Sequence, residues 1–382
     1  MVVLYPSLQL TQTILLLSSS AEDTQFGDIL HRNRGNSCMK FGFGGLKGAN
    51  GWPARWSKPA TSLSRVLTPL FASWMQKKRK KISRAPQVSR QIPVICIGNI
   101  VVGGSGKSPL VASLALKLRQ AGFTPGIVSR GFGGQAKNLP IEVTANSLPT
   151  AVGDEPLMLH KRTKCPVIVC RDRAKAVERL HFHHQVDVVL SDDGLQNTRL
   201  WRDFSVCVFN KDQGIGNGLE MPFGPLREPL SVIDHMDAII VRGTDYPKEM
   251  LIEMGIETQT PVFGSVADMA YVYRSDQPET HYALSELVHH GDFDAIAGIA
   301  SPSRFFEGLE QAGLSIRENA FADHHAYTEN EVAAWTQIIT TEKDAVKLVH
   351  LVQEPFWVVA LDSHQPEFET WLIDRLKQWS RV

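Results

Sequence analysis

The chain lacks net charge, a cysteine framework and any long apolar run, and each of these absences excludes a class of protein. Its 40 basic and 40 acidic residues cancel to a formal charge of zero, so the chain as a whole offers no electrostatic support for a nucleic-acid partner. No apolar stretch approaches the roughly 18 residues that suggest a membrane-spanning helix. The run Ile14–Leu17 is short and has no basic region before it, which argues against a secretory signal.

The cysteines are few and form no CxxC pair. They are odd in number and scattered along the chain: Cys38, Cys96, Cys165, Cys170 and Cys207. Three of them lie inside apolar, strand-like runs, where buried thiols are common. The sequence therefore predicts neither a disulfide framework nor a zinc site, and a reducing cytosol is the compartment that fits.

The N-terminal part falls into two segments. Residues 1–50 mix polar residues and glycine without a clear period, and we expect either a disordered leader or a start codon placed too far upstream. Within residues 51–92, the apolar residues of Leu63–Met75 follow helical spacing, and the basic run Lys77–Lys81 comes next. This pattern suits a helix that lies on an anionic bilayer surface. The alternative is a helix packed on the protein's own core with a solvated basic end.

From residue 93 onward, short β-branched runs alternate with helical patterns. We expect strands at 93–97, 125–129, 166–170, 186–190, 205–209 and 237–241, and helices at 108–121, 154–163 and 172–184. This alternation predicts an α/β fold whose mostly parallel sheet carries helices on both faces. Near residue 261 the pattern changes to alternating, tyrosine-bearing segments at 262–266 and 269–273. Beyond them we expect strands at 293–299, 336–341 and 356–361 and helices near 302–313, 328–335, 343–351 and 365–379. We therefore expect a core domain over 93–260 and a smaller C-terminal α/β domain over 261–382.

A glycine-rich loop follows the first expected strand, where residues 98–108 read GNIVVGGSGKS. Such a loop directs backbone N–H groups and a helix N-terminus at a polyphosphate, while its lysine reaches the outer phosphates and its serine can ligate Mg²⁺. Val101 occupies a position where the usual spacing has glycine. The alternative is a glycine-rich turn that binds no ligand. The residues expected to bind the nucleotide phosphates are Gly103, Gly104, Ser105, Gly106, Lys107 and Ser108.

Two pairs of adjacent carboxylates accompany this loop. Asp192 and Asp193 end an apolar strand, where one of them can face a metal ion while the other orients the loop. A plain Asp-Gly turn is the alternative. Asp154 and Glu155 open a helix pattern, where carboxylates also serve as caps. We consider Asp154 a candidate base for an acceptor hydroxyl, and Glu155 a partner of the metal.

Three further features are weaker as signals. Arg130 and Arg171 follow the ends of two expected strands, where they either clamp phosphate oxygens or lie solvated on the surface. The glycine- and proline-rich stretch Gly214–Leu226 either shapes a substrate entrance or is simply mobile. His324 stands in the run FADHH at 321–325, and a lone histidine is more often structural than catalytic.

Taken in order, these segments resemble the tetraacyldisaccharide 4'-kinase family. The matching stretches are GNIVVGGSGKSP (98–109), SRGFGG (129–134), VGDEP (152–156), SDDGLQ (191–196), GNGLEMPFGPLREP (216–229), GIASPSRFF (298–306), FADHH (321–325) and TTEKDAVKL (340–348). The resemblance implies a P-loop NTPase-like core joined by a β-ribbon to the smaller domain, with ATP and Mg²⁺ as cofactors and a membrane-docking helix in 51–92.

The activity implied by this resemblance is transfer of the γ-phosphate of ATP to the 4'-hydroxyl of an acylated glucosamine disaccharide 1-phosphate, giving lipid IVA. The resemblance also implies a monomeric, peripheral enzyme at the cytoplasmic face of the Gram-negative inner membrane. From the residues alone, two alternatives stay open: a nucleotide-switch or chaperone ATPase or GTPase, and a soluble small-molecule kinase of the same fold.

Residue by residue, the resemblance assigns roles to matching positions. Asp154 matches the general base and His324 the histidine that assists it, while Lys107 and Ser108 match the P-loop pair. The positions expected around the metal and nucleotide are Glu155, Asp192, Asp193 and Gln196, and those expected at the substrate are Arg130, Arg171 and Asn217. Two positions depart from the family pattern: Asn197 stands where a histidine is usual, and Phe132 replaces a common tyrosine.

Overall fold

The computed structural model describes residues 56, 68, 92–104, 106–136 and 139–379. The expectations for residues 1–50 and 51–92 lie outside this part of the chain, apart from Trp56, Thr68 and Ile92. Trp56 is buried, and its indole N–H donates to the carbonyl of Pro222 at 3.2 Å.

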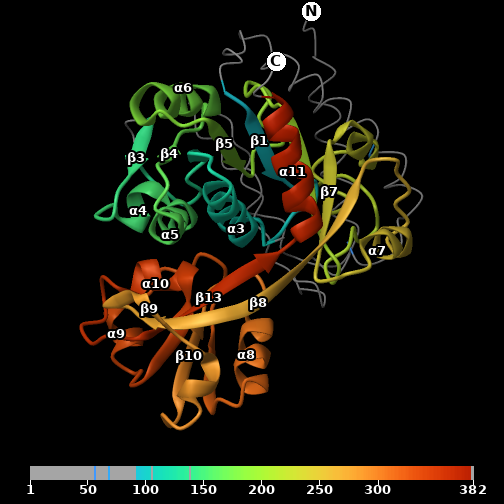
Figure 1. Ribbon diagram of the computed structural model, residues 1–382. Helices are drawn as coiled ribbons and strands as arrows, with labels where there is room; N and C mark the ends of the chain where they lie inside the picture. Colours follow the sequence, from blue (N-terminus) through green and yellow to red (C-terminus); the bar gives the residue numbers. More distant parts are fainter. Residues whose placement is uncertain (1–55, 57–67, 69–91, 105, 137–138, 380–382) are drawn as a thin grey trace, which may run out of the picture.

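Thirteen strands of the described residues form one hydrogen-bonded sheet that runs through two lobes (Figure 1). The first lobe has the strand order β3-β4-β2-β5-β1-β6-β7, and all neighbouring pairs are parallel except β3 with β4. Its strands are β1 (Val94–Gly98), β2 (Pro125–Ser129), β3 (Ile141–Val143), β4 (Val167–Val169), β5 (Val188–Asp192), β6 (Phe204–Asn210) and β7 (Ala238–Arg242).

Helices cover both faces of this first-lobe sheet. They are α3 (Lys107–Gln120), α4 (Pro149–Val152), α5 (Asp154–Thr163), α6 (Arg173–His184) and α7 (Pro247–Glu253). Along β1, Ile95 and Ile97 belong to the core cluster beneath α3 and α5, whereas Cys96 faces the opposite side, where α7 contributes Leu251. A strand that is buried on both faces consists mostly of apolar residues. For this reason the predicted positions of these strands agree well with the observed ones.

The second lobe is built on four strands: β10 (Phe293–Ala297), β11 (Ile316–Ala320), β12 (Ile338–Thr341) and β13 (Trp357–His364). It also contains α8 (Pro302–Gln311), α9 (Glu329–Val332), α10 (Glu342–Leu348) and the hairpin strand β9 (Gln277–Tyr282). The pairs β11–β10, β10–β12 and β12–β13 are parallel. The helix expected over 328–335 is only the four-residue α9.

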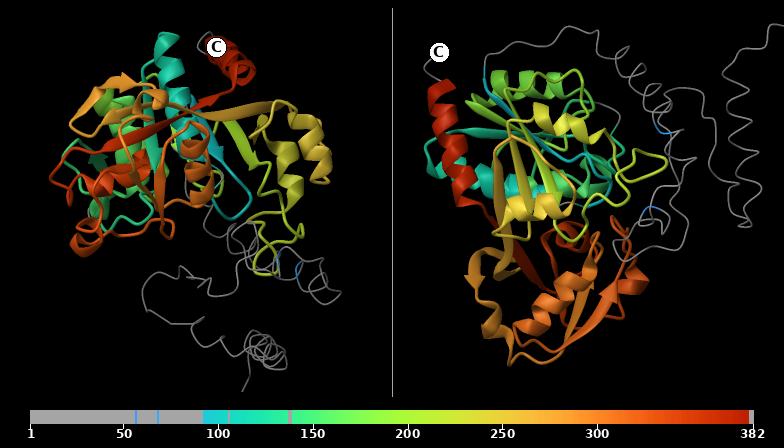
Figure 2. Two further views of the ribbon diagram at one scale, coloured as in Figure 1. Left: turned by 90° about the horizontal axis from the view of Figure 1, so that it is seen from below. Right: turned by 90° about the vertical axis from the view of Figure 1, so that its right-hand side faces the viewer.

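The two lobes share one long strand, β8 (Val262–Arg274). Its first residues pair in parallel with β7, and the part from Val266 onward pairs antiparallel with β13. The two short segments expected at 262–266 and 269–273 are therefore one continuous strand. Figures 1 and 2 show β8 and β13 crossing together from one lobe to the other.

The last helix, α11 (Pro366–Trp379), returns to the first lobe (Figure 1). Phe368, Leu372 and Leu376 lie in the same core cluster as Leu110 and Leu114 of α3. The sequence groups this helix with the C-terminal domain because it follows β13 directly, yet its apolar face is buried against the core of the first lobe. No helix of the described residues is both long and apolar enough to cross a membrane.

Candidate active site

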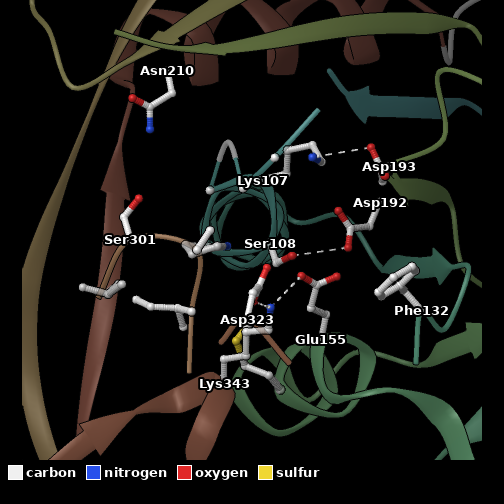
Figure 3. A pocket seen from close by; sticks show the side chains of 18 of the residues that line it. Lys107, Ser108, Phe132, Glu155, Asp192, Asp193, Asn210, Ser301, Asp323 and Lys343 are labelled. Atoms are coloured by element: carbon white, nitrogen blue, oxygen red, sulfur yellow. Dashed lines mark hydrogen bonds and ion pairs between the residues drawn. The ribbon is translucent and has the colours of Figure 1, made fainter. Parts of the chain in front are cut away.

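A cavity of 1620 Å³ lies between the lobes and brings most of the expected site residues together (Figure 3). It opens at the carboxyl ends of the parallel strands, where ligands of such sheets bind. Both lobes contribute to its wall. Residues from the first lobe include Gly103, Gly104, Gly106, Lys107, Ser108, Phe132, Glu155, Asp192 and Asp193, and those from the second include Ser301, Asp323, His324 and Lys343.

The glycine-rich loop leaves β1 and leads into α3, as expected. Val101 is buried in an apolar cluster and pairs with Leu226, so its side chain packs where a glycine would leave a gap. Gly106 has a φ of 66°, which only glycine adopts at little cost, and no side chain of the described residues caps α3. The helix N-terminus is therefore available to a phosphate group. Ser105 lies outside the described residues.

The two aspartates at the end of β5, Asp192 as its last residue and Asp193 just after it, face different partners. Oδ1 of Asp193 lies 3.5 Å from Nζ of Lys107, and Arg227 donates to the same carboxylate at 3.1 and 3.2 Å. Asp193 has a φ of 48°. Burial opposes its charge, but Lys107 and Arg227 hold the pKa of Asp193 below its ordinary value. Asp193 thus contacts the P-loop lysine in this structure.

Asp192 lies beside the P-loop serine instead, as Figure 3 shows. Ser108 Oγ donates to its Oδ2 at 3.5 Å, while Oδ1 is buried without a hydrogen-bond partner among the described residues. Burial and the charges of Glu155 and Asp193 raise the pKa of Asp192 to about 7. A buried, unpaired carboxylate oxygen beside a second carboxylate and a hydroxyl fits the donor set of Mg²⁺.

No group of three histidine, cysteine or carboxylate side chains in the described part of the chain is arranged to hold a metal. Mg²⁺ at phosphoryl-transfer sites usually takes one or two protein oxygens and completes its shell with phosphate oxygens and water. Ser108, Asp192 and Glu155 are the residues that fit this role.

Asp154 is the first residue of α5, and its carboxylate accepts a hydrogen bond from the second lobe. Nδ1 of His324 lies 3.0 Å from Oδ1 and 2.9 Å from Oδ2 of Asp154. Oδ1 also accepts from the backbone N–H of Glu155 at 2.9 Å, so the helix-end contact and the histidine contact coexist. Asp154 is buried, and its neighbours Glu155 and His324 line the cavity.

The electrostatics of this pair favour an ionised carboxylate. Burial opposes the charge, but the hydrogen bond from His324 and the nearby Lys343 and Lys347 hold the pKa of Asp154 below its ordinary value of 3.8. For His324, burial and Lys343 lower the pKa, yet the hydrogen bond and charge of Asp154 outweigh them and raise it above 6.5. The backbone of His324 has a φ of 62°, a conformation that costs a non-glycine residue energy.

Two backbone features position this pair. Gly153 precedes Asp154 with a φ of 94°, and a Cβ there would lie 2.6 Å from the carbonyl oxygen of Phe132. On the other side, the backbone N–H of His324 donates to the carbonyl of Gly298 at 3.2 Å. Each partner of the pair is thus oriented by contacts within its own lobe.

Comparison with known proteins identifies the family of this chain. A family model described as LpxK, tetraacyldisaccharide-1-P 4'-kinase, matches residues 60–377. The chain belongs to the tetraacyldisaccharide 4'-kinase family. A relative of that name from Thiobacillus denitrificans is 38% identical over 333 residues, which cover 85% of this chain and 98% of the relative. Another from Dechloromonas aromatica is 42% identical over 286 residues, covering 74% and 82% respectively.

A solved structure supports the same family. The crystal structure of LpxK from Aquifex aeolicus in complex with ATP is 25% identical, with a TM-score of 0.65 and coverage of 82% of this chain and 99% of that one. The predicted resemblance and the predicted P-loop NTPase-like α/β fold are confirmed. Membership of a tetraacyldisaccharide 4'-kinase family also favours the kinase hypothesis over the nucleotide-switch alternative.

Among the remaining positions assigned from the tetraacyldisaccharide 4'-kinase resemblance, Arg130 and Arg171 line the cavity and are exposed. Gln196 also lines it, but its amide spans two protein groups, the carbonyl of Asn99 at 3.0 Å and Arg227 at 3.4 Å. Gln196 therefore stabilises the start of the P-loop at Asn99.

Asn217 differs from the other residues assigned to the substrate. Its amide donates to the carbonyl of Phe223 and accepts from the backbone of Leu219, and it is not part of the cavity wall. Both ends of the side chain are used within its own loop. Asn217 therefore stabilises its own loop, and its side chain does not line the cavity where a substrate would bind.

The two departures from the family pattern also lie at the cavity. Asn197 donates to the carbonyl of Arg171 at 3.3 Å. The ring of Phe132 is 61% exposed and lies 5.1 Å from the ring of His324. Phe132 therefore lacks the hydroxyl of the usual tyrosine but keeps an aromatic contact with His324 of the other lobe.

Sequence reasoning missed two cations of the site. Arg227 holds Asp193 and Gln196, and Lys343 contacts Glu155, Asp323 and His324. Both lie inside stretches that carried the resemblance, GPLREP and TTEKDAVKL. Their charge and their place in these stretches could have marked Arg227 and Lys343 as candidates for the site. Only the folded chain shows which carboxylates they contact.

Proposed function

We propose that this protein transfers the γ-phosphate of ATP to the 4'-hydroxyl of a tetraacyldisaccharide 1-phosphate, giving lipid IVA. The observation that carries the proposal is the Asp154–His324 pair between the two lobes: Asp154 is buried beside the cavity, and His324 lines it together with the P-loop. A P-loop positions the donor phosphates, and an ionised carboxylate beside it provides a base for an acceptor alcohol.

In this proposal Asp154 accepts the proton of the sugar hydroxyl as the hydroxyl oxygen attacks the γ-phosphorus. The bond between the γ-phosphorus and the β,γ-bridging oxygen breaks, and ADP leaves. The N–H of His324 holds the carboxylate in place, because both carboxylate oxygens lie within 3.0 Å of Nδ1. Lys107 leaves Asp193 and contacts the transferred group, whose charge it stabilises. Arg130 and Arg171 at the exposed rim are placed to contact the anionic substrate.

Ser108, Asp192 and Glu155 would hold Mg²⁺, which neutralises charge on the β- and γ-phosphates when bound. The unpaired Oδ1 of Asp192 supports this assignment. Asp193 was also expected at the metal, but its contacts with Lys107 and Arg227 favour a role in holding the lysine.

The expectation that residues 51–92 dock on an anionic membrane surface stays a proposal, since all but three of them lie outside the described part of the chain. A peripheral, monomeric enzyme at the cytoplasmic face of the inner membrane is the corresponding location. Vesicle sedimentation of the full chain, compared with Lys77–Lys81 changed to glutamine, tests it; equal binding of both proteins to anionic vesicles would refute docking through these charges.

The experiment that tests the activity incubates purified protein with Mg-ATP and the disaccharide lipid and measures the mass of the lipid. We expect one added phosphate, with ³¹P–¹H correlation placing it on the 4' oxygen. A non-acylated disaccharide in a parallel reaction tests the soluble-kinase alternative, and GTP in place of ATP tests the nucleotide-switch alternative. Hydrolysis of either nucleotide without a phosphorylated lipid would refute the proposal.

A further inference from the structure

Lys343, the second residue of α10, contacts three groups at the junction of the lobes. Its Nζ lies 2.8 Å from Oδ1 of Asp323, 3.3 Å from Oε1 of Glu155 and 3.3 Å from Nε2 of His324. The side chain is 14% exposed. Figure 3 shows the ammonium between Asp323 and Glu155, below Ser108. One largely buried cation thus touches both the histidine that contacts the proposed base and a carboxylate of the proposed metal site.

The donors and acceptors at this contact determine which tautomer the neutral ring of His324 adopts. A lysine ammonium has three hydrogens and accepts none, and here three groups surround it. Two are carboxylates, so the third, Nε2 of His324, presents a lone pair to the ammonium. A neutral imidazole has a single N–H, which is then on Nδ1 and points at Asp154.

The opposite tautomer is unfavourable at both ends of the ring. A hydrogen on Nε2 would point at the ammonium of Lys343, and a bare Nδ1 would direct its lone pair at the carboxylate of Asp154, 2.9 Å away. Lys343 also neutralises a competitor. Oδ2 of Asp323 lies 3.8 Å from Nε2 of His324, and this carboxylate would attract a hydrogen on Nε2 if the lysine did not pair with it.

From these contacts we propose that Lys343 is a positioning residue: it keeps Nε2 of His324 free of hydrogen, so that the single N–H of the ring is held on Nδ1 against Asp154. The proposal rests on the proposed function, because it explains how the base of that reaction is oriented. Without Lys343, the ring lies between the carboxylates of Asp154 and Asp323, which favours a hydrogen on both nitrogens.

The test reads the ring directly. The full chain is labelled with ¹⁵N-histidine, and the ring nitrogens are correlated with the ring protons at a pH just above the titration range of the wild-type His324 ring. The His324→Gln variant assigns the signal among the 13 histidines. We expect the wild-type ring to show a protonated Nδ1 and an unprotonated Nε2. In Lys343→Met we expect Nε2 to carry a hydrogen at the same pH.

Two matched variants separate this role from a general loss of structure. Lys343→Arg keeps a cationic donor and should keep the wild-type tautomer. Lys347→Met removes a lysine one turn later on the same helix, whose Nζ contacts Asp344, the carbonyl of His325 and, at 4.0 Å, Oδ2 of Asp154, but not the ring of His324. That variant should lower stability and leave the tautomer unchanged.

Kinetics give a second readout. If the proposed activity holds, Lys343→Met should lower kcat by roughly ten- to a hundred-fold, the scale of a misplaced catalytic group, with little change in KM for ATP. A protonated Nε2 in the wild type, or an unchanged tautomer in Lys343→Met, would overturn the proposal. If Lys343→Met does not fold, the wild type and Lys343→Arg decide. Because the spectrum needs no substrate, an inactive wild type would refute the proposed function and leave this measurement standing.

Discussion

Nδ1 of His324 lies 2.9 Å from Oδ2 of Asp154, although 170 residues separate them along the chain. The first-lobe carboxylate and the second-lobe imidazole therefore form one unit, and substitutions at the two positions are coupled. Residues that act as a unit show non-additive effects, so the double variant is as informative as either single variant.

Asp154→Asn should lower lipid phosphorylation by about 10²- to 10⁴-fold, because an amide cannot accept the proton of the acceptor hydroxyl. His324→Gln should have a smaller effect, and the double variant should be little worse than Asp154→Asn. Initial rates with radiolabelled ATP measure this, and circular dichroism checks that each variant is folded. Turnover near the wild-type rate in Asp154→Asn would contradict the role of Asp154 as base.

Asp192→Asn should raise stability while lowering activity. The charge of Asp192 is buried, its Oδ1 has no partner among the described residues, and Glu155 and Asp193 repel it. The amide removes this repulsion and still accepts a hydrogen bond from Ser108. We expect a higher Tm without metal and a weaker dependence of Tm on added Mg²⁺. An unchanged Mg²⁺ dependence would remove Asp192 from the proposed metal site.

The His324–Asp154 contact predicts a pH-dependent contribution to stability. Because the folded-state pKa of His324 is raised above 6.5, protonated histidine favours the folded state. The contribution is fully present below about pH 6.5 and is lost as the pH rises through the folded-state value. The difference in unfolding free energy between wild type and His324→Gln should therefore shrink with rising pH across this window. A difference that stays constant would argue against the shift.

Arg162→Met should destabilise the junction of the lobes. The buried guanidinium of Arg162 in α5 donates to Glu342 at 2.6 Å and to Asp362 at 3.3 Å, which belong to the second lobe. Its removal leaves Glu342 buried without this partner, a change that costs about 3–5 kcal/mol for buried pairs. Urea unfolding measures it.

The control for this prediction is the double variant Arg162→Met with Glu342→Gln. Because the remaining charge is then removed as well, it should recover part of the lost stability. If it is no more stable than Arg162→Met alone, the unpaired charge of Glu342 is not the cause.

The sequence predicted best the elements that are buried on both faces. The strands at 94–98, 188–192 and 204–210 are mostly apolar and almost entirely buried, and a run of that kind is typical of a strand covered on both faces. The elements it missed are mostly short or exposed. β9 is exposed along nearly its whole length and β11 along much of its length, so neither has the apolar pattern that would mark it.

The site divides in the same way. The loop at 98–108 and the carboxylates at 154–155 and 192–193 could be found in the sequence, because each is a local feature at the end of a predicted strand or the start of a predicted helix. The partners of these groups could not be found in that way. Whether Asp193 faces Lys107 or a metal depends on side-chain directions after the strand has ended.

The glycine-rich loop at the edge of a parallel sheet could be predicted from the residues alone, because turn geometry and apolar runs are encoded over a few neighbouring positions. That His324 and Lys343 reach Asp154 and Glu155 could not be predicted in this way. Those contacts depend on how β8 and β13 carry the second lobe across to the first, and on the buried Arg162 that joins the lobes. They come from packing between distant segments, which no local pattern of residues specifies.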